Sequence, residues 1–272
     1  MENNFKFIDQ VKNVSILRLE YIKKYWWISL PLLVIGIFLL KFGWDNNNGK
    51  LLNAGVITLC AEIFTIIMGI IFADQEARKV FMKMVASTLN FSYKEYGVVG
   101  NTKAELFKIG NRKEITHFLE GEYKNMPVSL YNYKSITGSG KNIASYRYTV
   151  FEMTYPFEIP RVILFKKSIL NEKCMLPDKI SVKLEGNFNK YFELYTQEKF
   201  DKDIRVIFTP DVIAFLIDEA PNINFEMCDN KIYIYEEKFI TKKDDLFLLY
   251  KTAQMISVKL QSNLETFSRI SK

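Results

Sequence analysis

Histidine and cysteine are scarce in this sequence, and their scarcity excludes two kinds of site. The 272 residues include one histidine, His117, and three cysteines, Cys60, Cys174 and Cys228. A structural zinc site needs four Cys or His ligands, and a triad hydrolase needs a histidine beside a nucleophile in a recognisable setting. We therefore predict no metal, no cofactor and no catalytic triad. His117 is expected to be a structural or surface residue, and Cys174 and Cys228 are expected to be free thiols.

A phosphate-binding loop is also missing, although one stretch resembles it. Residues 135–142 read SITGSGKN, and aligning Lys141 with the Walker lysine puts Ser135 where the first glycine belongs and Asn142 where the hydroxyl belongs. The residues that follow, ASYRYTVFEMT, predict a strand, whereas a Walker loop leads into a helix. We predict a Gly-rich connection between two antiparallel strands.

Neither sign of charge dominates the chain. The formal net charge of +6 comes from 37 Lys and Arg against 31 Asp and Glu, and it divides evenly between the two sides of Tyr96. Neither half is basic enough to indicate nucleic acid as a partner. The acidic residues are scattered, as in Asp201/Asp203 and Asp244/Asp245, so a hydrolase that uses only carboxylates stays open as an alternative.

Two long apolar runs lie near the N-terminus. Residues 26–42 (WWISLPLLVIGIFLLKF) have about the minimum length for crossing a bilayer, and residues 51–73 (LLNAGVITLCAEIFTIIMGIIFA) are longer. Tryptophans bracket the first run, as is usual at membrane interfaces. A cleaved signal peptide is disfavoured because acidic residues precede the run and no small-residue cleavage pattern follows it. A buried core hairpin is the other alternative. We predict a two-helix transmembrane hairpin, residues 26–73, with spans at 26–42 and 51–73.

The flanking cations predict the orientation of this hairpin. Basic residues precede the first span and follow the second, and few lie between the spans: Lys6, Lys12, Arg18, Lys23 and Lys24, then Arg78, Lys79 and Lys83, against Lys41 and Lys50. Because cytoplasmic flanks carry the excess of Lys and Arg, both termini are expected in the cytoplasm. The sequence thus predicts a multi-pass protein of the cell (inner) membrane, whose first partner is the lipid bilayer.

Glu62 is the candidate polar residue within the membrane. It lies near the centre of the second span, where a charge costs about 2.5 to 3.5 kcal/mol on insertion scales. It could serve a proton or ion path, or join copies of the hairpin into a homo-oligomer. We favour association, since two spans enclose no pathway and Gly55 and Gly69 permit close helix contact. The alternative is a tolerated, protonated Glu that is hydrogen-bonded to Thr58, Thr65 or a neighbouring helix.

The rest of the chain predicts an α+β fold. Residues 1–25 form an amphipathic cytoplasmic segment, residues 74–96 a helical connector, and residues 97–272 a cytoplasmic domain. Strands are predicted at 115–123, 126–134, 146–155, 161–166, 180–184, 192–196, 204–208, 223–228 and 231–235. One helix is expected to begin at Thr209-Pro210. A C-terminal amphipathic helix is expected from Thr241, with a core-facing stripe formed by Leu246, Leu249, Ala253, Ile256, Leu260, Leu264 and Phe267.

A motif in this domain resembles a known family. Its positions are Leu184, Glu185, Phe188, Lys190 and Phe192, followed about fifteen residues later by Thr209 and Pro210. The pattern is similar to that of the uncharacterised bacterial membrane family called domain of unknown function 3137, and of related candidate-phylum proteins. The resemblance covers residues 114–267 and implies a bacterial membrane protein with two N-terminal spans. It brings no catalytic residues, and core packing of large rings also explains the motif.

These observations favour a membrane-anchored cytoplasmic interaction or scaffolding module without catalytic activity, which acts on a protein partner that the sequence does not identify. Two alternatives stay open. One is an enzyme that works at the membrane surface through scattered carboxylates. The other is a sensor of a lipid or small ligand.

Overall fold

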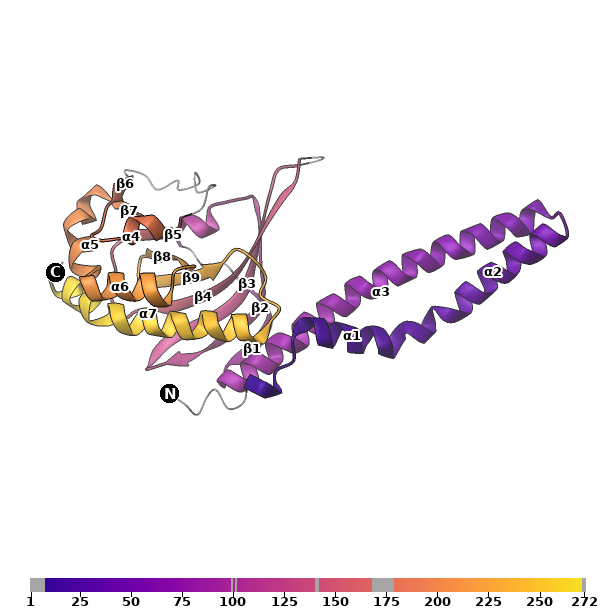
Figure 1. Cartoon of the computed structure of the whole chain (residues 1–272), viewed down its shortest axis with the longest axis horizontal. Coiled ribbons are helices and arrows are strands. Elements are labelled where there is room, and N and C mark those ends of the chain that lie inside the picture. Colours follow the sequence, from indigo (N-terminus) through magenta and orange to yellow (C-terminus); the bar gives the residue numbers. More distant parts are fainter. Residues whose placement is uncertain (1–7, 99, 101, 140–141, 168–178, 271–272) are drawn as a thin grey trace. The chain divides into compact units, whose positions relative to one another are not determined.

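The computed structural model describes residues 8–98, 100, 102–139, 142–167 and 179–270, and the chain divides into two compact units. The first unit, Met1–Thr88, is helical, and the second, Leu89–Lys272, is built around one antiparallel sheet (Figure 1). Helices come first, and strands followed by a long C-terminal helix come later. The predicted α+β class is therefore confirmed.

The helical unit is a hairpin preceded by a short helix. Its elements are η2 (Ile8–Gln10), α1 (Val14–Tyr25), η3 (Trp26–Ile28), α2 (Leu30–Asp45) and α3 (Gly49–Leu89), whose last residue belongs to the second unit. The turn between α2 and α3 is held by Asn48, whose Oδ1 accepts the backbone N–H groups of Lys50 (3.1 Å) and Leu51 (3.3 Å). These are two of the four N–H groups that a helix start leaves without an intrahelical partner.

The two predicted spans differ in length in the structure. Helix α3 has 41 residues and is by itself long and apolar enough to cross a bilayer. Helix α2 has 16 residues, or about 24 Å, and it reaches the required length only together with α1 and η3, from which it is bent by 45°. Pro31 lies in the first turn of α2, where a proline is well tolerated.

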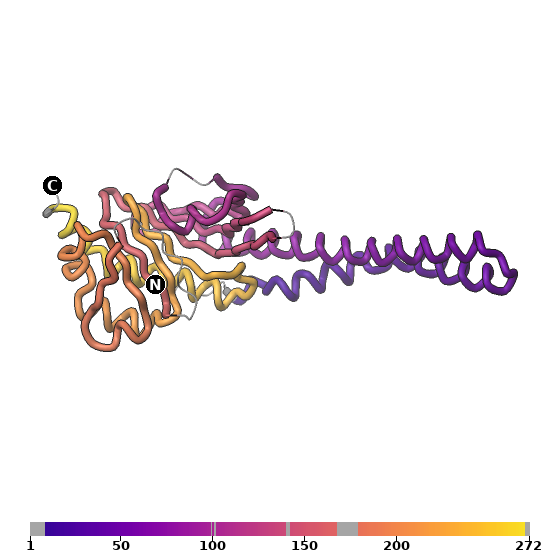
Figure 2. The backbone as a smooth tube through the Cα atoms, turned by 90° about the horizontal axis from the view of Figure 1, so that it is seen from above, coloured from indigo at the N-terminus to yellow at the C-terminus, as the bar shows by residue number. Residues whose placement is uncertain are grey.

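The second unit is a nine-stranded sheet in which every neighbouring pair is antiparallel. Figure 1 labels the strands, and Figure 2 traces the backbone of the same chain from above. Its spatial order is β1-β2-β3-β4-β9-β8-β5-β7-β6. The strands are β1 (Ser92–Gly97), β2 (Arg112–Tyr123), β3 (Met126–Thr137), β4 (Ala144–Thr154), β5 (Val162–Lys166), β6 (Lys179–Val182), β7 (Phe192–Gln197), β8 (Asn224–Cys228) and β9 (Lys231–Glu236). Strands β1 to β4 form a meander, and β9 joins it to the remaining strands by pairing with both β4 and β8.

Helices pack around this sheet. They are η4 (Glu105–Phe107), α4 (Phe188–Tyr191), η5 (Glu198–Phe200), α5 (Asp201–Ile207), α6 (Pro210–Glu219) and α7 (Lys243–Ile270). Helix α7 lies along one face and contacts β4 and β9 (Figure 1). All seven apolar residues of its predicted stripe are buried. The stripe therefore faces the core, as the spacing predicts. The predicted helix start at Thr209-Pro210 is likewise confirmed, with Thr209 at the N-cap position of α6.

One predicted strand is wrong and one observed strand was not predicted. Residues 204–208 belong mainly to α5, in which Ile204 and Ile207 are buried three residues apart and Arg205 forms an i,i+4 ion pair with Asp201 at 3.8 Å. The short apolar run IRVIF matched a strand pattern, but helical spacing of its buried residues decides its structure. Strand β1 follows α3 directly, after Asn90 adopts a φ of 58°, the left-handed conformation that commonly ends helices.

Candidate functional site

The family-like motif forms part of the domain core. Leu184, Phe188 and Phe192 are buried, whereas Glu185 and Lys190 are exposed. The Phe188 ring lies 5.2 Å from that of Phe192 and 6.5 Å from that of Phe208, and α4 contacts α6. Aromatic rings at these separations stabilise one another beyond their burial. The motif's apolar positions therefore act in packing.

The second part of the motif starts a helix. Pro210 occupies the first turn of α6, and the Thr209 hydroxyl donates a hydrogen bond to the Asp211 carboxylate, which lowers the pKa of that carboxyl. The Asn263 side chain on α7 donates to the Ile207 carbonyl at 2.9 Å and so ties α7 to the end of α5. These contacts place Thr209 and Pro210 in a structural junction.

Glu62 is enclosed within the hairpin. Its exposed fraction is 2%, and neither carboxylate oxygen has a hydrogen-bond partner among the described residues. The hydroxyls of Thr58 and Thr65 donate instead to the carbonyls of Ala54 (2.8 Å) and Ala61 (2.9 Å) in their own helix. The two threonines expected as partners of a tolerated Glu62 are thus engaged elsewhere, and a role for Glu62 stays a prediction.

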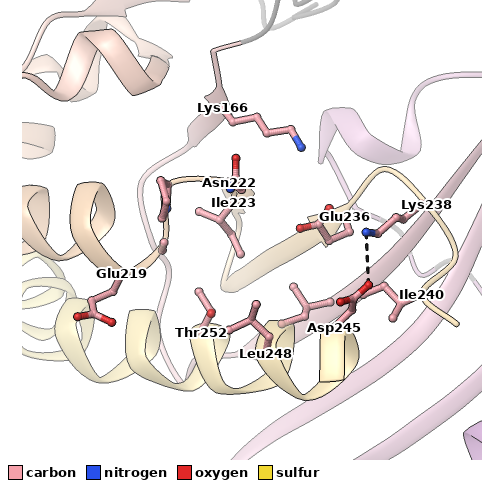
Figure 3. A pocket seen from close by; sticks show the side chains of 13 residues that line it. Lys166, Glu219, Asn222, Ile223, Glu236, Lys238, Ile240, Asp245, Leu248 and Thr252 are labelled. Carbon is pink, nitrogen blue, oxygen red and sulfur yellow. Dashed lines mark ion pairs between the residues drawn. The ribbon is translucent and has the colours of Figure 1, made fainter. Parts of the chain in front are cut away.

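A pocket of about 370 Å³ lies in the second unit between the end of α6, the start of α7 and the strands β5 and β9 (Figure 3). Its polar lining includes Lys166, Glu219, Glu236, Lys238 and Asp245. Figure 3 shows the carboxylates of Glu219 and Glu236 on opposite sides, while the third carboxylate, Asp245, is paired with Lys238 at 3.7 Å. The carboxylates do not converge on one point.

The chemistry available in this pocket is limited. Its lining carries charges of both signs, and the described residues form no group of three or more His, Cys, Asp or Glu side chains that could hold a metal ion. A general base must reach the proton that it removes within about 2.6 to 3.2 Å or through one water, and the pocket shows no nucleophile paired with a base in this way. It could hold a small polar molecule, but no reaction follows from its geometry.

A buried ionic cluster joins three distant parts of the domain. Glu226 on β8 is fully buried, and its carboxylate accepts the backbone N–H groups of Glu105 (2.7 Å) and Leu106 (3.1 Å) at the start of η4. Arg161 donates to the Glu105 carboxylate and to the Lys103 carbonyl, each at 2.6 Å. Lys108 also pairs with Glu105 at 2.7 Å. The cluster thereby fixes η4, whose buried residues Leu106 and Phe107 pack into the core.

Burial controls the proton affinity of this cluster. Desolvation raises the pKa of Glu226 to about 7, against the opposing effect of its two backbone hydrogen bonds and of Arg161. Burial likewise raises the pKa of the nearby Cys228 thiol to about 12. Because the thiolate is the reactive form, Cys228 is a structural residue, in accord with the expected free thiol.

Sequence reasoning missed the cluster because its members lie far apart in the chain. Glu105, Arg161 and Glu226 come from three segments separated by more than fifty residues each. The one available signal was Glu226 itself, a charged residue in the centre of the strand NFEMC, in which every residue is buried. A charge at such a position is rarely found without partners.

The structure also places His117 and the strands on either side of the Gly-rich segment 135–142. His117 lies at an irregularity of β2, with a φ of 53°, and its Nδ1 is 2.9 Å from the Tyr93 hydroxyl. Residue Thr137 of β3 pairs with Ala144 of β4, so the predicted antiparallel connection is confirmed in place of a Walker loop. Lys141 and Cys174 lie outside the described residues.

Comparison with known proteins shows a similarity in fold. No family model matches the chain, and no curated protein matches it. Among solved structures, the chain is similar to the crystal structure of the mycobacterial trehalose monomycolate transport factor A. The TM-score is 0.51 at 10% sequence identity, and the match covers 67% of this chain and 93% of that one. At this identity, the similarity extends to the fold alone.

Proposed function

We propose that the protein is a membrane-anchored accessory module, in which the hairpin crosses the inner membrane and the α+β unit binds a protein partner in the cytoplasm. The observation that carries the proposal is the apolar surface of the hairpin. Large side chains such as Phe38, Ile57 and Phe64 are 63%, 69% and 65% exposed. Only 11% of the apolar window of α3 is buried. Exposed apolar surface on this scale marks contact with a membrane or a partner.

This exposure also weighs against the soluble alternative. The core helix of a soluble protein buries most of its apolar residues against its own chain, whereas α2 and residues 51–73 of α3 present most of theirs outward. Hydrocarbon is the environment in which such a surface is stable, since helices satisfy all their backbone polar groups internally.

The ion pairs at the open end of the hairpin suit the proposed cytoplasmic side. Asp74 forms ion pairs with Arg78 at 2.8 Å and with Arg18 at 3.6 Å, which joins α3 to α1. Charged groups of this kind belong at the level of the headgroups and not in hydrocarbon. Together with the excess of Lys and Arg near both ends of the hairpin, they support termini in the cytoplasm.

Self-association through the hairpin belongs to the same proposal. Gly55 lies in the contact between the two helices of one hairpin, because a Cβ there would lie 2.8 Å from the Leu40 side chain. A contact between copies would therefore use the outer faces of the helices. Cys60 is exposed on α3 and can report such a contact.

A second candidate function is an accessory role in lipid handling. The solved structure with a similar fold is titled a trehalose monomycolate transport factor. The hairpin of this chain also carries a large apolar cavity, of about 800 Å³. The cavity is the specific observation that favours this candidate, since shared fold does not by itself imply shared function. We include no catalytic step in either candidate, because the carboxylates of the polar pocket do not converge.

Topology and fractionation test the anchor. Full-length protein should stay in the membrane pellet after alkaline carbonate extraction. A green fluorescent protein fused after Lys272 should fluoresce, and an alkaline phosphatase fused there should be inactive. A chain that stays soluble without detergent, or an active phosphatase fusion, would contradict the proposal.

Oxidative crosslinking tests self-association. In membranes carrying a Cys174→Ser background, Cys60 should give a disulfide-linked dimer, and Cys60→Ser should abolish it. The absence of a dimer across a range of oxidant concentrations would argue against a homo-oligomer formed through this face. Crosslinking with mass spectrometry in native membranes should recover a protein partner linked to the α+β unit, and repeated failure to do so would argue against an interaction module.

A further inference from the structure

The helices of the hairpin are in close contact near the turn and separate toward its open end. A Cβ added at Gly36, Gly43 or Gly55 would lie within 2.7 to 2.8 Å of Leu59, Leu52 or Leu40 on the opposite helix. A Cβ added at Gly69 would meet nothing within 4 Å. Three glycines are therefore explained by close helix packing, and Gly69 is not. A glycine inside a helix costs about 1 kcal/mol relative to alanine, so its presence at an open position requires another reason.

Gly69 borders the large cavity of the hairpin. The cavity has a volume of about 800 Å³ and lies between the α1 to α2 segment and α3. Its walls include the rings of Tyr21, Tyr25 and Trp26 on one side and Ile66 and Gly69 on the other. This volume falls within the usual range of about 300 to 1,000 Å³ for ligand pockets with largely apolar walls. Gly69 thus leaves room for an occupant.

The polar groups of the cavity select the charge of that occupant. Among the described residues that line it, Glu76 alone is charged. The hydroxyls of Ser29 and Thr65 donate to the carbonyls of Trp26 (2.7 Å) and Ala61 (2.9 Å), so their hydrogens are directed at their own helices. The carboxylate of Glu76 and the rings of Tyr21 and Trp26 line the same cavity, and both kinds of group attract an ammonium group. The ring of Tyr25 already faces the Lys24 ammonium, which lies 5.4 Å from its centroid. The complementary ligand is an apolar chain that ends in a cation.

We propose that this cavity binds one amine-bearing phospholipid of the phosphatidylethanolamine type. Its ammonium group lies against Glu76 and the rings of Tyr21 and Trp26, and an acyl chain lies along Gly69. Lys23 and Lys24, in the last turn of α1, attract the lipid phosphate. The same two lysines would also attract an anionic lipid without an amine, so selectivity for the amine comes from Glu76. This inference rests on the proposed membrane anchor.

Lipid retention by the full-length protein tests the inference. The protein is incorporated into vesicles containing equal amounts of phosphatidylethanolamine and phosphatidylglycerol, extracted in mild detergent, and its retained lipid is quantified by mass spectrometry. The wild type should enrich phosphatidylethanolamine about five-fold, as expected for an ammonium held by aromatic rings and a carboxylate. Glu76→Gln, which keeps the side-chain shape, should reduce the enrichment to the vesicle ratio.

Gly69→Phe provides an independent test of the cavity. A Cβ at this position meets nothing within 4 Å, so the ring has open space to enter, and it should remove most of the retained lipid. Ile63→Phe is the matched control, because Ile63 is 59% exposed on the same helix. This control should retain lipid as the wild type does. If Gly69→Phe does not fold, as judged by its elution on gel filtration, Glu76→Gln still decides the proposal.

The outcomes separate this inference from the anchor. A wild type that resists carbonate extraction but retains both lipids in the vesicle ratio would overturn the lipid site and leave the anchor intact. Unchanged retention in Gly69→Phe, or an undiminished preference in Glu76→Gln, would overturn the site as well. A wild type released by carbonate would instead overturn the anchor.

Discussion

The buried carboxyl of Glu226 predicts an unusual dependence of stability on pH. Burial raises its pKa from 4.5 to about 7, so the folded chain holds this proton more tightly than the unfolded chain does. Between these two pH values the unfolded state has released a proton that the folded state keeps, and the free energy of unfolding falls as pH rises. At about 1.4 kcal/mol for each pKa unit, the contribution lost between pH 4.5 and 7 is about 3 kcal/mol.

Glu226→Gln isolates this contribution. Glutamine has a similar shape and stays neutral, so it resembles the protonated carboxyl that accepts from Glu105 and faces the Leu106 N–H. At pH 5 the variant should match the wild type to within about 1 kcal/mol, the size of one net hydrogen bond. At pH 8 it should be more stable than the wild type by up to about 3 kcal/mol, because the wild type then carries a buried charge.

Urea unfolding of the full-length protein in nonionic detergent, at pH values from 5 to 8, measures the effect. Near-ultraviolet circular dichroism follows the buried tyrosines of the sheet. Glu158→Gln is the control, because Glu158 is exposed, and it should keep the pH dependence of the wild type. The reasoning is refuted if the wild type becomes more stable relative to Glu226→Gln as pH rises. That result would mean that Arg161 and the two backbone N–H groups outweigh desolvation.

Three further predictions concern packing. Phe188→Ala should lower the free energy of unfolding by about 3 to 5 kcal/mol. Lys190→Ala, at an exposed motif position, should change it by less than about 0.5 kcal/mol. Urea unfolding at pH 6 measures both values, and this difference is expected if the motif acts in packing. Arg161→Ala should lower the free energy of unfolding by about 3 to 5 kcal/mol in the same assay, since it removes one partner of the buried Arg161–Glu105 ion pair. A loss below about 1 kcal/mol would show that water screens this pair. Gly43→Leu should lower the temperature at which the detergent-solubilised protein aggregates, because the new side chain meets α3. Gly49→Leu is the control and should not lower this temperature, since a Cβ there has nothing within 4 Å. Equal effects of the two variants would contradict the close contact of α2 with α3.

The sequence was most informative where one physical pattern acts over a long segment. The apolar run of residues 51–73 continues without a break in α3, and the Leu246 to Phe267 stripe of α7 is buried throughout. Such patterns predict structure well because the same spacing repeats over many helical turns. Local chemistry was also sufficient at Thr209-Pro210, where a capping residue and a proline start α6.

Short segments and contacts between distant residues could not be predicted in the same way. Residues 204–208 read equally well as a strand or a helix, and tertiary packing of Ile204 and Ile207 decides between them. The partners of Glu226 come from chain segments that no local spacing relates. The hairpin cavity depends on where two helices diverge, and the sequence indicated only that Gly69 permits a close helix contact, whereas a Cβ there meets nothing within 4 Å.

The strand order has a consequence for biosynthesis. Strand β4 keeps an unpaired edge until β9 docks on it, in a register that pairs Val150 with Tyr235. Strands β5, β7 and β6 join the meander only through β8 and β9. The ribosome must therefore release nearly the whole chain before the sheet closes, and the nascent meander leaves an aggregation-prone edge exposed. A chaperone or rapid membrane targeting of the emerging hairpin would shorten the life of that intermediate.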